Sequence, residues 1–336
     1  MKRNVIIAGK NDIAVEVLTY IRKRFKKEIN AYVVCNQTET GADSWQHSLR
    51  LAAEQAGVPE CRLEDVYTME NSLFLSLEYD RLIKPDKFVS KELYNIHFSL
   101  LPQYRGMYTS ALPILFGEEY SGVTLHRIDQ GIDTGDILQQ KRFRLDAEET
   151  GRSLYLKYIK AGTELVKENL ETLLFYPNEI QAVPQNEESA SYFNKQSIDY
   201  AHLSIDLNQT ACYIHRQIRA YSFREYQMPK IFGKDVIGSQ ITKKRSLCKP
   251  GTIVSKSARG FVLSTMDYDL LVHYDCLVEL IDACQKGDLQ IVKEICKAKQ
   301  HVNAVDKTGK SPIKAARENS HLEIIAYLLG RGAEET

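Results

Sequence analysis

Val5-Ile6-Ile7-Ala8-Gly9 is a short apolar run, and a potential helix cap, Asn11-Asp12, follows it closely. Apolar residues then recur every four positions, at Ile13, Val17, Ile21 and Phe25. This spacing indicates one face of an amphipathic helix, so the segment is predicted to be a buried strand that leads into a helix. The run at Val5 is too short for the apolar region of a signal peptide.

The same alternation continues through the first half of the chain. Further strands are predicted at residues 31–35, 73–77, 93–97, 122–128 and 137–145, and helices at about 49–57 and 150–175. An α/β chain of this kind forms a mostly parallel sheet with helices on both faces. Ligands of such sheets bind beyond the carboxyl ends of the strands, which directs attention to the residues there.

The composition excludes several classes of protein. The 336 residues contain 44 Lys+Arg and 44 Asp+Glu, so the basic excess typical of nucleic-acid-binding proteins is missing. The apolar runs are too short to cross a bilayer. The seven cysteines form no CxxC pair, which favours reduced thiols over a disulfide framework or a zinc site. We therefore expect a cytoplasmic protein with no metal and no membrane association.

Two changes in pattern divide the rest of the chain. A polar stretch at residues 177–197 indicates a connection, and residues 201–272 combine a helix capped at Asp206 with short, glycine-punctuated strands. In the tail, Leu289-Gln290-Ile291-Val292 matches Leu322-Glu323-Ile324-Ile325 at a separation of 33, the ankyrin period. The predicted domains are residues 1–200, a small strand-rich domain at 201–272, and ankyrin helices at 273–336.

Three polar residues are candidates for chemistry. Asn95 and His97 lie two apart in a predicted strand, so their side chains project from the same face. At a strand's carboxyl end, an amide and an imidazole so placed can reach one carbonyl group. Asp133 lies between Gly131 and Gly135, in a loop suited to close approach to a ligand.

These residues belong to two motifs, Asn95-Ile96-His97-Phe98-Ser99-Leu100-Leu101-Pro102 and Asp129-Gln130-Gly131-Ile132-Asp133-Thr134-Gly135. Together the motifs resemble the signature of the folate-dependent formyltransferases, which include methionyl-tRNA formyltransferase and the sugar N-formyltransferases. The resemblance is strong over residues 1–200 and weaker over 201–272. It implies a Rossmann-like catalytic domain with Asn95, His97 and Asp133 as the catalytic triad.

The resemblance also implies a formyl donor, N10-formyltetrahydrofolate, bound in a cleft between residues 77–83 and the loop of residues 129–133. The residues expected to bind it are Leu77, Tyr79, Ile83, Asp129 and Asp133. Asn95 would donate a hydrogen bond to the oxyanion of the tetrahedral intermediate, and His97 would take a proton from the attacking amine. Whether Asp133 orients His97 or relays a proton stays open at this stage.

The nearest resemblance is to enzymes that formylate dTDP-linked amino-dideoxyhexoses for O-antigen synthesis, some of which have an ankyrin tail. It implies a nucleotide-sugar substrate with its amine at C3 or C4. The candidate substrate-binding residues are Arg105, Tyr108, Tyr221 and Phe223. The alternative is an enzyme that acts on aminoacyl-tRNA, like methionyl-tRNA formyltransferase. Residues 36–44 contain no Lys or Arg, which counts against that alternative and against any nucleic-acid partner.

The small domain and the tail raise two further expectations. Apolar strands with little cover at 201–272, and the way in which the sugar-acting relatives pair, predict a homodimer. For the tail, two roles remain open. It could be a lid that stabilises the small domain, or its concave face could bind a partner or a second nucleotide ligand.

Overall fold

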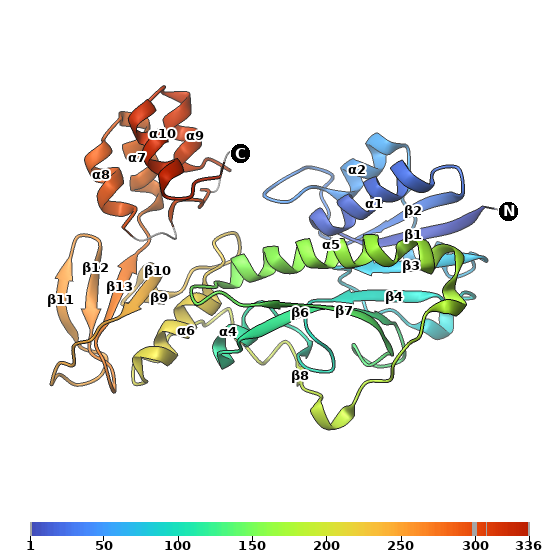
Figure 1. The fold of residues 1–336 in the computed structure, drawn as a ribbon, viewed down its shortest axis with the longest axis horizontal. Coiled ribbons are helices and arrows are strands. Elements are labelled where there is room, and N and C mark those ends of the chain that lie inside the picture. Colours follow the sequence, from blue (N-terminus) through green and yellow to red (C-terminus); the bar gives the residue numbers. More distant parts are fainter. Residues whose placement is uncertain (1, 298–300, 307, 335–336) are drawn as a thin grey trace. The chain divides into compact units, whose positions relative to one another are not determined.

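The computed structural model describes residues 2–297, 301–306 and 308–334 of the chain (Figure 1). Two compact units are formed. The first comprises the chain up to residue 113 together with 118–147 and 153–198, and the second comprises 114–117, 148–152 and the chain from residue 199 onward. No helix in these described ranges is both long enough and apolar enough to cross a membrane.

A six-stranded sheet with the order β2-β1-β3-β4-β6-β7 forms the centre of the first unit. Four strands are parallel: β1 (Arg3–Gly9), β2 (Ile29–Cys35), β3 (Ser72–Leu77) and β4 (Leu93–His97). Strand β6 (Tyr120–Arg127) runs antiparallel to β4, and the edge strand β7 (Ile137–Arg144) runs antiparallel to β6. The prediction of a mostly parallel sheet is therefore confirmed.

Helices cover both faces of this sheet because its strands carry apolar side chains on both sides. On one face α1 (Asn11–Phe25) lies beside α5 (Gly151–Phe175), and two ion pairs join them, Lys167–Glu16 and Arg24–Glu171, each at 2.8 Å. On the other face Ile6, Phe74 and Leu93 pack against residues of the short helix α3 (Leu63–Val66). Successive residues of β1, such as Ile6 and Ile7, are thus buried on opposite faces.

Shorter elements complete the first unit. Helix α2 (Leu49–Ala56) begins after Ser48, whose side chain accepts a hydrogen bond from the amide of Leu51. The others are α4 (Leu112–Phe116), which runs into the second unit, the strands β5 (Arg105–Gly106) and β8 (Tyr192–Phe193), and 3₁₀ turns at Pro85–Lys87, Pro177–Glu179 and Glu187–Ser189.

The pairing of β5 with β8 is the feature that sequence patterns do not predict. These strands form a two-stranded parallel sheet in which Gly106 is opposite Phe193. Gly106 has φ +90°, and a Cβ atom there would lie 2.2 Å from the carbonyl oxygen of Phe193. Only glycine allows so close an approach. The polar connection after α5 is therefore attached to the first unit.

A five-stranded antiparallel sheet, with the order β11-β12-β13-β10-β9, forms the core of the second unit together with one helix, α6 (Ala211–Tyr221). The strands are β9 (Lys230–Ile231), β10 (Lys234–Ile241), β11 (Ile253–Ser257), β12 (Gly260–Leu263) and β13 (Leu270–Tyr274). Ile214 and Ile218 of α6 pack with Phe261 and Val272 of the sheet. This observation supports the prediction of a strand-rich domain.

The start of α6 differs from the predicted one. Thr210, not Asp206, caps the helix, because its side chain accepts a hydrogen bond from the amide of Tyr213. The carboxylate of Asp206 instead accepts from the amide of Asn208 in the preceding turn. Both residue types favour helix N-termini, so the sequence alone does not distinguish them.

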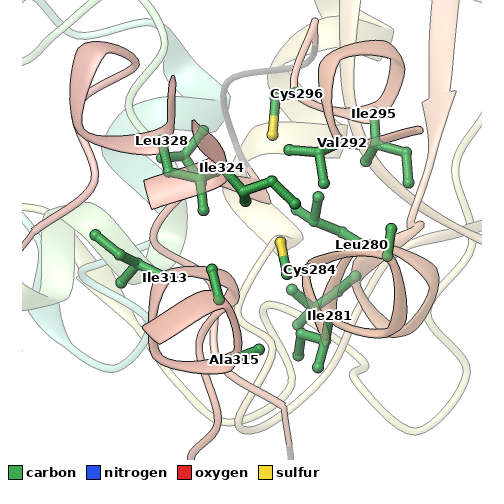
Figure 2. Close-up of a cluster of buried hydrophobic side chains, with 14 residues drawn as sticks. Leu280, Ile281, Cys284, Val292, Ile295, Cys296, Ile313, Ala315, Ile324 and Leu328 are labelled. Atoms are coloured by element: carbon green, nitrogen blue, oxygen red, sulfur yellow. The ribbon is translucent and has the colours of Figure 1, made fainter. Parts of the chain in front are cut away.

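The described residues of the tail contain the helices α7 (Leu277–Lys286), α8 (Leu289–Ile295), α9 (Pro312–Glu318) and α10 (Leu322–Gly330). The first residues of α8 and α10 are 33 positions apart, which is the separation of the repeated sequence. Their buried side chains form one apolar cluster that includes Leu280, Ile313 and Leu328 (Figure 2).

Candidate active site

A cavity of about 660 Å³ opens in the first unit beyond the carboxyl ends of β3 and β4. Asn95, His97 and Asp133 all line it, together with His126 of β6. Asn95 is opposite His126 in the register of β4 and β6, so the sheet itself brings the two side chains together. The three residues predicted as a triad therefore face one cavity.

The hydrogen bonds of His126 fix the orientation of the Asn95 amide. The backbone carbonyl of Arg127 lies 2.7 Å from Nδ1 of His126 and can only accept, so Nδ1 carries the proton. Nε2 of the neutral ring is then an acceptor, and it lies 3.0 Å from Nδ2 of Asn95. One amide hydrogen of Asn95 is used in this bond. The second is left to point into the cavity.

The tautomer of His97 is fixed by the same kind of contact. The carbonyl oxygen of Tyr104 lies 2.8 Å from Nε2, so Nε2 is protonated in the neutral ring. Nδ1 is then the basic nitrogen, 3.4 Å from Oδ2 of Asp133. His97 can therefore accept a proton at Nδ1 beside a carboxylate that stabilises the resulting imidazolium.

Asp133 is held at both its backbone and its side chain. Its φ of +56° lies in the left-handed region, which aspartate enters more readily than most residues. Its Oδ2 accepts a 2.9 Å hydrogen bond from the amide of Gly106. Its Oδ1 lies 3.7 Å from Nε2 of His126, so the carboxylate lies between two imidazole rings whose centroids are 6.4 Å apart.

Burial changes the charges of two groups around the cavity. It lowers the pKa of His126 to about 4, against the opposing effect of Asp133, and this ring is therefore neutral at pH 7. Burial also raises the pKa of Glu78 to about 7. The Glu78 carboxyl, at the end of β3, accepts hydrogen bonds from the Tyr155 hydroxyl at 2.8 Å and from the Asn11 amide at 3.2 Å.

The residues predicted to bind folate fall into two groups. Tyr79, Ile83, Asp129 and Asp133 line the cavity. Leu77 does not line it and is 0% exposed, because it is the last residue of β3 and faces the core. Asp129 also stabilises its loop, since Oδ1 accepts hydrogen bonds from the Gly131 amide at 3.0 Å and the Thr134 hydroxyl at 2.7 Å.

The four predicted substrate-binding residues lie in both units. In the first, the guanidinium of Arg105 is hydrogen-bonded to the side chains of Gln185 and Glu187, and the Tyr108 hydroxyl donates to the carbonyl of Lys195 at 2.9 Å. Neither residue lines the cavity. In the second unit, Tyr221 packs at the edge of the apolar core, and Phe223 is buried, with 5% exposure, beside Tyr226.

His126 and Glu78 are site residues that sequence reasoning missed. His126 lies in the predicted strand at 122–128, but its role depends on the register of β4 and β6, which no local pattern gives. Glu78 follows a fully buried strand and has φ +59°, which turns its side chain toward Asn11 and Tyr155. A carboxylate directly after a buried strand is the signal that could have identified it.

Two family models match the sequence. The one described as Formyl transferase matches residues 1–170, and the one described as Formyl transferase, C-terminal domain, matches residues 197–274. Both matches end before helix α7. The chain is also 30% identical to the methionyl-tRNA formyltransferase of Fervidobacterium nodosum over 291 residues, which are 80% of this chain and 90% of that enzyme.

Two solved structures resemble this chain over most of its length. One is an N-formyltransferase from Helicobacter canadensis in complex with folinic acid and dTDP-3-aminofucose. It has a TM-score of 0.75 and 39% identity over 82% of this chain and 100% of that one. The other is WlaRD, a sugar 3N-formyl transferase in the presence of dTDP and 5-N-formyl-THF. It has a TM-score of 0.75 and 37% identity, and the match covers 82% of this chain and 98% of that one.

Proposed function

The chain belongs to the formyl transferase family, and on this premise we propose that it formylates the 3-amino group of a dTDP-linked amino-dideoxyhexose. It is an N-formyltransferase, and its formyl donor is N10-formyltetrahydrofolate. The observation that carries the proposal is the convergence of Asn95, His97 and Asp133 on one cavity. Their geometry suits attack by an amine on a formyl carbon.

Asn95 has the role of stabilising negative charge. As the amine attacks, the formyl oxygen becomes an oxyanion, and the second amide hydrogen of Asn95 donates to it. His126 holds the amide with its nitrogen in the donating position, because Nε2 accepts the other hydrogen. A fixed donor of this kind stabilises a transition state by about 3 kcal/mol.

His97 and Asp133 have the role of transferring protons in the reaction. The attacking nitrogen forms a bond to the formyl carbon and must lose a proton, while N10 of the folate must gain one when its bond to that carbon breaks. Nδ1 of His97 accepts the first proton. The Tyr104 carbonyl already fixes the tautomer of His97, so Asp133 is not needed for that purpose. This favours Asp133 as the group that stabilises the imidazolium and relays the proton toward N10.

Several observations support a sugar acceptor over an aminoacyl-tRNA. The loop between β2 and α2 contains Glu39 and Asp43 but no Lys or Arg, which gives an RNA phosphate nothing to pair with. The two similar structures were solved with a dTDP-sugar or with dTDP, and their names specify a 3-amino sugar or 3N-formylation. The tRNA alternative is supported by the name of the Fervidobacterium relative.

The remaining parts of the proposal concern organisation and setting. We assign residues 1–200 to catalysis, 201–272 to a small second domain and 273–336 to an ankyrin-type tail, in a cytoplasmic homodimer that serves O-antigen synthesis. Tyr79, Ile83 and Asp129 are assigned to the folate, and Arg105, Tyr108, Tyr221 and Phe223 to the substrate side. Strand β11 supports pairing, because all five of its residues are exposed at a sheet edge.

The acceptor can be identified directly. The purified full chain is incubated with N10-formyltetrahydrofolate and, separately, with dTDP-sugars that have an amine at C3, an amine at C4 or no amine, and with initiator Met-tRNA. Mass spectrometry detects the formylated product. We expect turnover with the C3 amine and at least about tenfold lower kcat/KM with the C4 amine, since a misplaced amine loses attack geometry.

Formylation of Met-tRNA in preference to every sugar would overturn the proposal in favour of the alternative. Sedimentation of the same preparation tests the dimer, which a monomer at micromolar concentration would exclude. Truncation after Asp275, followed by titration with the accepted dTDP-sugar, tests the tail. Unchanged stoichiometry would leave it a stabilising role only.

A further inference from the structure

The segment Tyr104–Gly106 contacts two residues of the triad at once. The carbonyl of Tyr104 accepts a hydrogen bond from His97 at 2.8 Å, and the amide of Gly106 donates to the Asp133 carboxylate at 2.9 Å. The relative positions of His97 and Asp133 therefore depend on this short segment. Arg105 lies between the two contacts, and its side chain is only 7% exposed.

Gln185 connects Arg105 to the loop that contains Asp133. Its Oε1 accepts hydrogen bonds from Nε and Nη2 of Arg105 at 3.1 and 2.9 Å. Its Nε2 donates to the backbone carbonyls of Asp133 and Gly135, both at 2.8 Å. All the hydrogen-bonding capacity of one side-chain amide is thus used to join the two segments that hold the triad.

The connections form a closed ring. Gln185 binds the backbone of Asp133, the Asp133 carboxylate binds Gly106, and Gly106 is bonded covalently to Arg105, which returns to Gln185. Within the ring, Asp133 has a left-handed backbone, which is uncommon for a non-glycine residue and costs energy unless its surroundings stabilise it. We propose that Gln185 is a positioning residue, which holds Asp133 in the conformation that serves His97.

This inference rests on the catalytic role proposed for Asp133, and it competes with a simpler one. Gln185 belongs to the connection that follows α5, so it could merely attach that connection to Arg105. Glu187 provides the matched comparison, because its carboxylate also binds the Arg105 guanidinium, at 2.9 and 2.6 Å. Its side chain is 71% exposed, so the pair contributes little to stability.

Two nearly isosteric substitutions separate the two roles. Gln185→Glu keeps an acceptor for Arg105 but replaces the donor to both loop carbonyls with an oxygen that repels them. Glu187→Gln weakens only the attachment to Arg105. If Gln185 positions Asp133, Gln185→Glu lowers kcat about 10- to 100-fold with KM for both substrates within about threefold, because a small misplacement of a catalytic group has that effect. Glu187→Gln then stays within about twofold of the wild type.

Hydrogen exchange of the free protein gives a readout that does not need turnover. The amides of residues 129–136 should exchange faster in Gln185→Glu than in the wild type or Glu187→Gln, while β1, β3 and β4 remain protected. Wild-type kcat and unchanged loop exchange in Gln185→Glu would overturn the inference, as would equal losses in both variants. Asp133→Asn distinguishes failure of the catalytic role of Asp133 from failure of the positioning role of Gln185. If Asp133→Asn retains full activity, the proposed role of Asp133 is wrong. If it is inactive while Gln185→Glu is normal, only the positioning role is wrong.

Discussion

The carboxyl end of the catalytic sheet, where the cavity lies, and the helical tail both contain buried side chains. Different interactions hold these side chains in place. Around the cavity the polar side chains of Asn95, His97 and Asp133 are held by directional hydrogen bonds or ion pairs. In the tail, apolar side chains of the described helices pack in one cluster (Figure 2). Hydrogen bonds depend steeply on angle and distance, whereas apolar burial does not.

The two regions should therefore respond to substitution in opposite ways. At Asn95, His97 and Asp133, loss of one polar atom changes the geometry of the chemistry with little effect on stability. In the tail, loss of a few methyl groups changes stability with little effect on the chemistry. Two substitutions test this contrast, and a third tests the buried carboxyl group of Glu78, which lies beside these three residues in the lining of the cavity.

His97→Asn is expected to have the largest effect. The substitution replaces the imidazole with a shorter amide that has no basic nitrogen, so kcat should fall about 10³-fold or more. Thermal unfolding, followed by the fluorescence of Trp45, the single tryptophan, should shift by no more than a few degrees. Retained activity would contradict the role given to His97, and a large drop in melting temperature would contradict the contrast.

Leu280→Ala tests the other side of the comparison. Leu280 of α7 is 0% exposed, so its truncation leaves a cavity and should destabilise the tail by about 3 kcal/mol. Hydrogen exchange of amides in α7–α10 measures this locally. The exposed Val278→Ala, in the same helix, is the control. Below the temperature at which the tail opens, kcat should equal that of the wild type. A fall in kcat there would show that the tail contributes to catalysis.

Glu78→Gln should have the smallest effect, and the effect should depend on pH. Burial raises the pKa of Glu78 from an ordinary value of 4.5 to about 7, so the folded protein retains this proton where the unfolded chain releases it. The wild type therefore loses stability from this group as pH rises from about 5 to 8. Glutamine does not titrate, so the variant should gain on the order of 2 kcal/mol over that range, allowing for partial exposure. Thermal melts at pH 5 and 8, followed by Trp45, measure the gain, and a constant difference between the proteins would refute it.

Much of the catalytic fold could be predicted from the sequence because its elements carry strong local patterns. The apolar run at residues 5–9 and the four-residue spacing from Ile13 to Phe25 correspond to β1 and α1. In these elements neighbours in sequence are also neighbours in space. Asn95, His97 and Asp133 face one cavity, as the resemblance carried by two motifs led us to expect, although the two motifs lie in different segments.

The rest depends on contacts between distant segments. The orientation of Asn95 depends on a hydrogen bond to His126, which is 31 residues away in sequence. The Arg105 guanidinium likewise donates to Gln185, which is 80 residues away. Leu77 was expected to face the folate, but strand alternation turns it to the core. Neither composition nor periodicity contains this information, because it comes from strand register and from the path of the connection after α5.

That path has a practical consequence for protein engineering. After α5 the chain returns to form β8 beside β5 before it continues into the second unit at Asp199. A hybrid enzyme joined at the end of α5 would leave behind Gln185 and the strand that accompanies Arg105. A hybrid that receives the carboxyl-terminal part of another formyltransferase, in order to change acceptor preference, should therefore be joined beyond Ile198. The segment between α5 and Ile198 then stays with its own catalytic sheet.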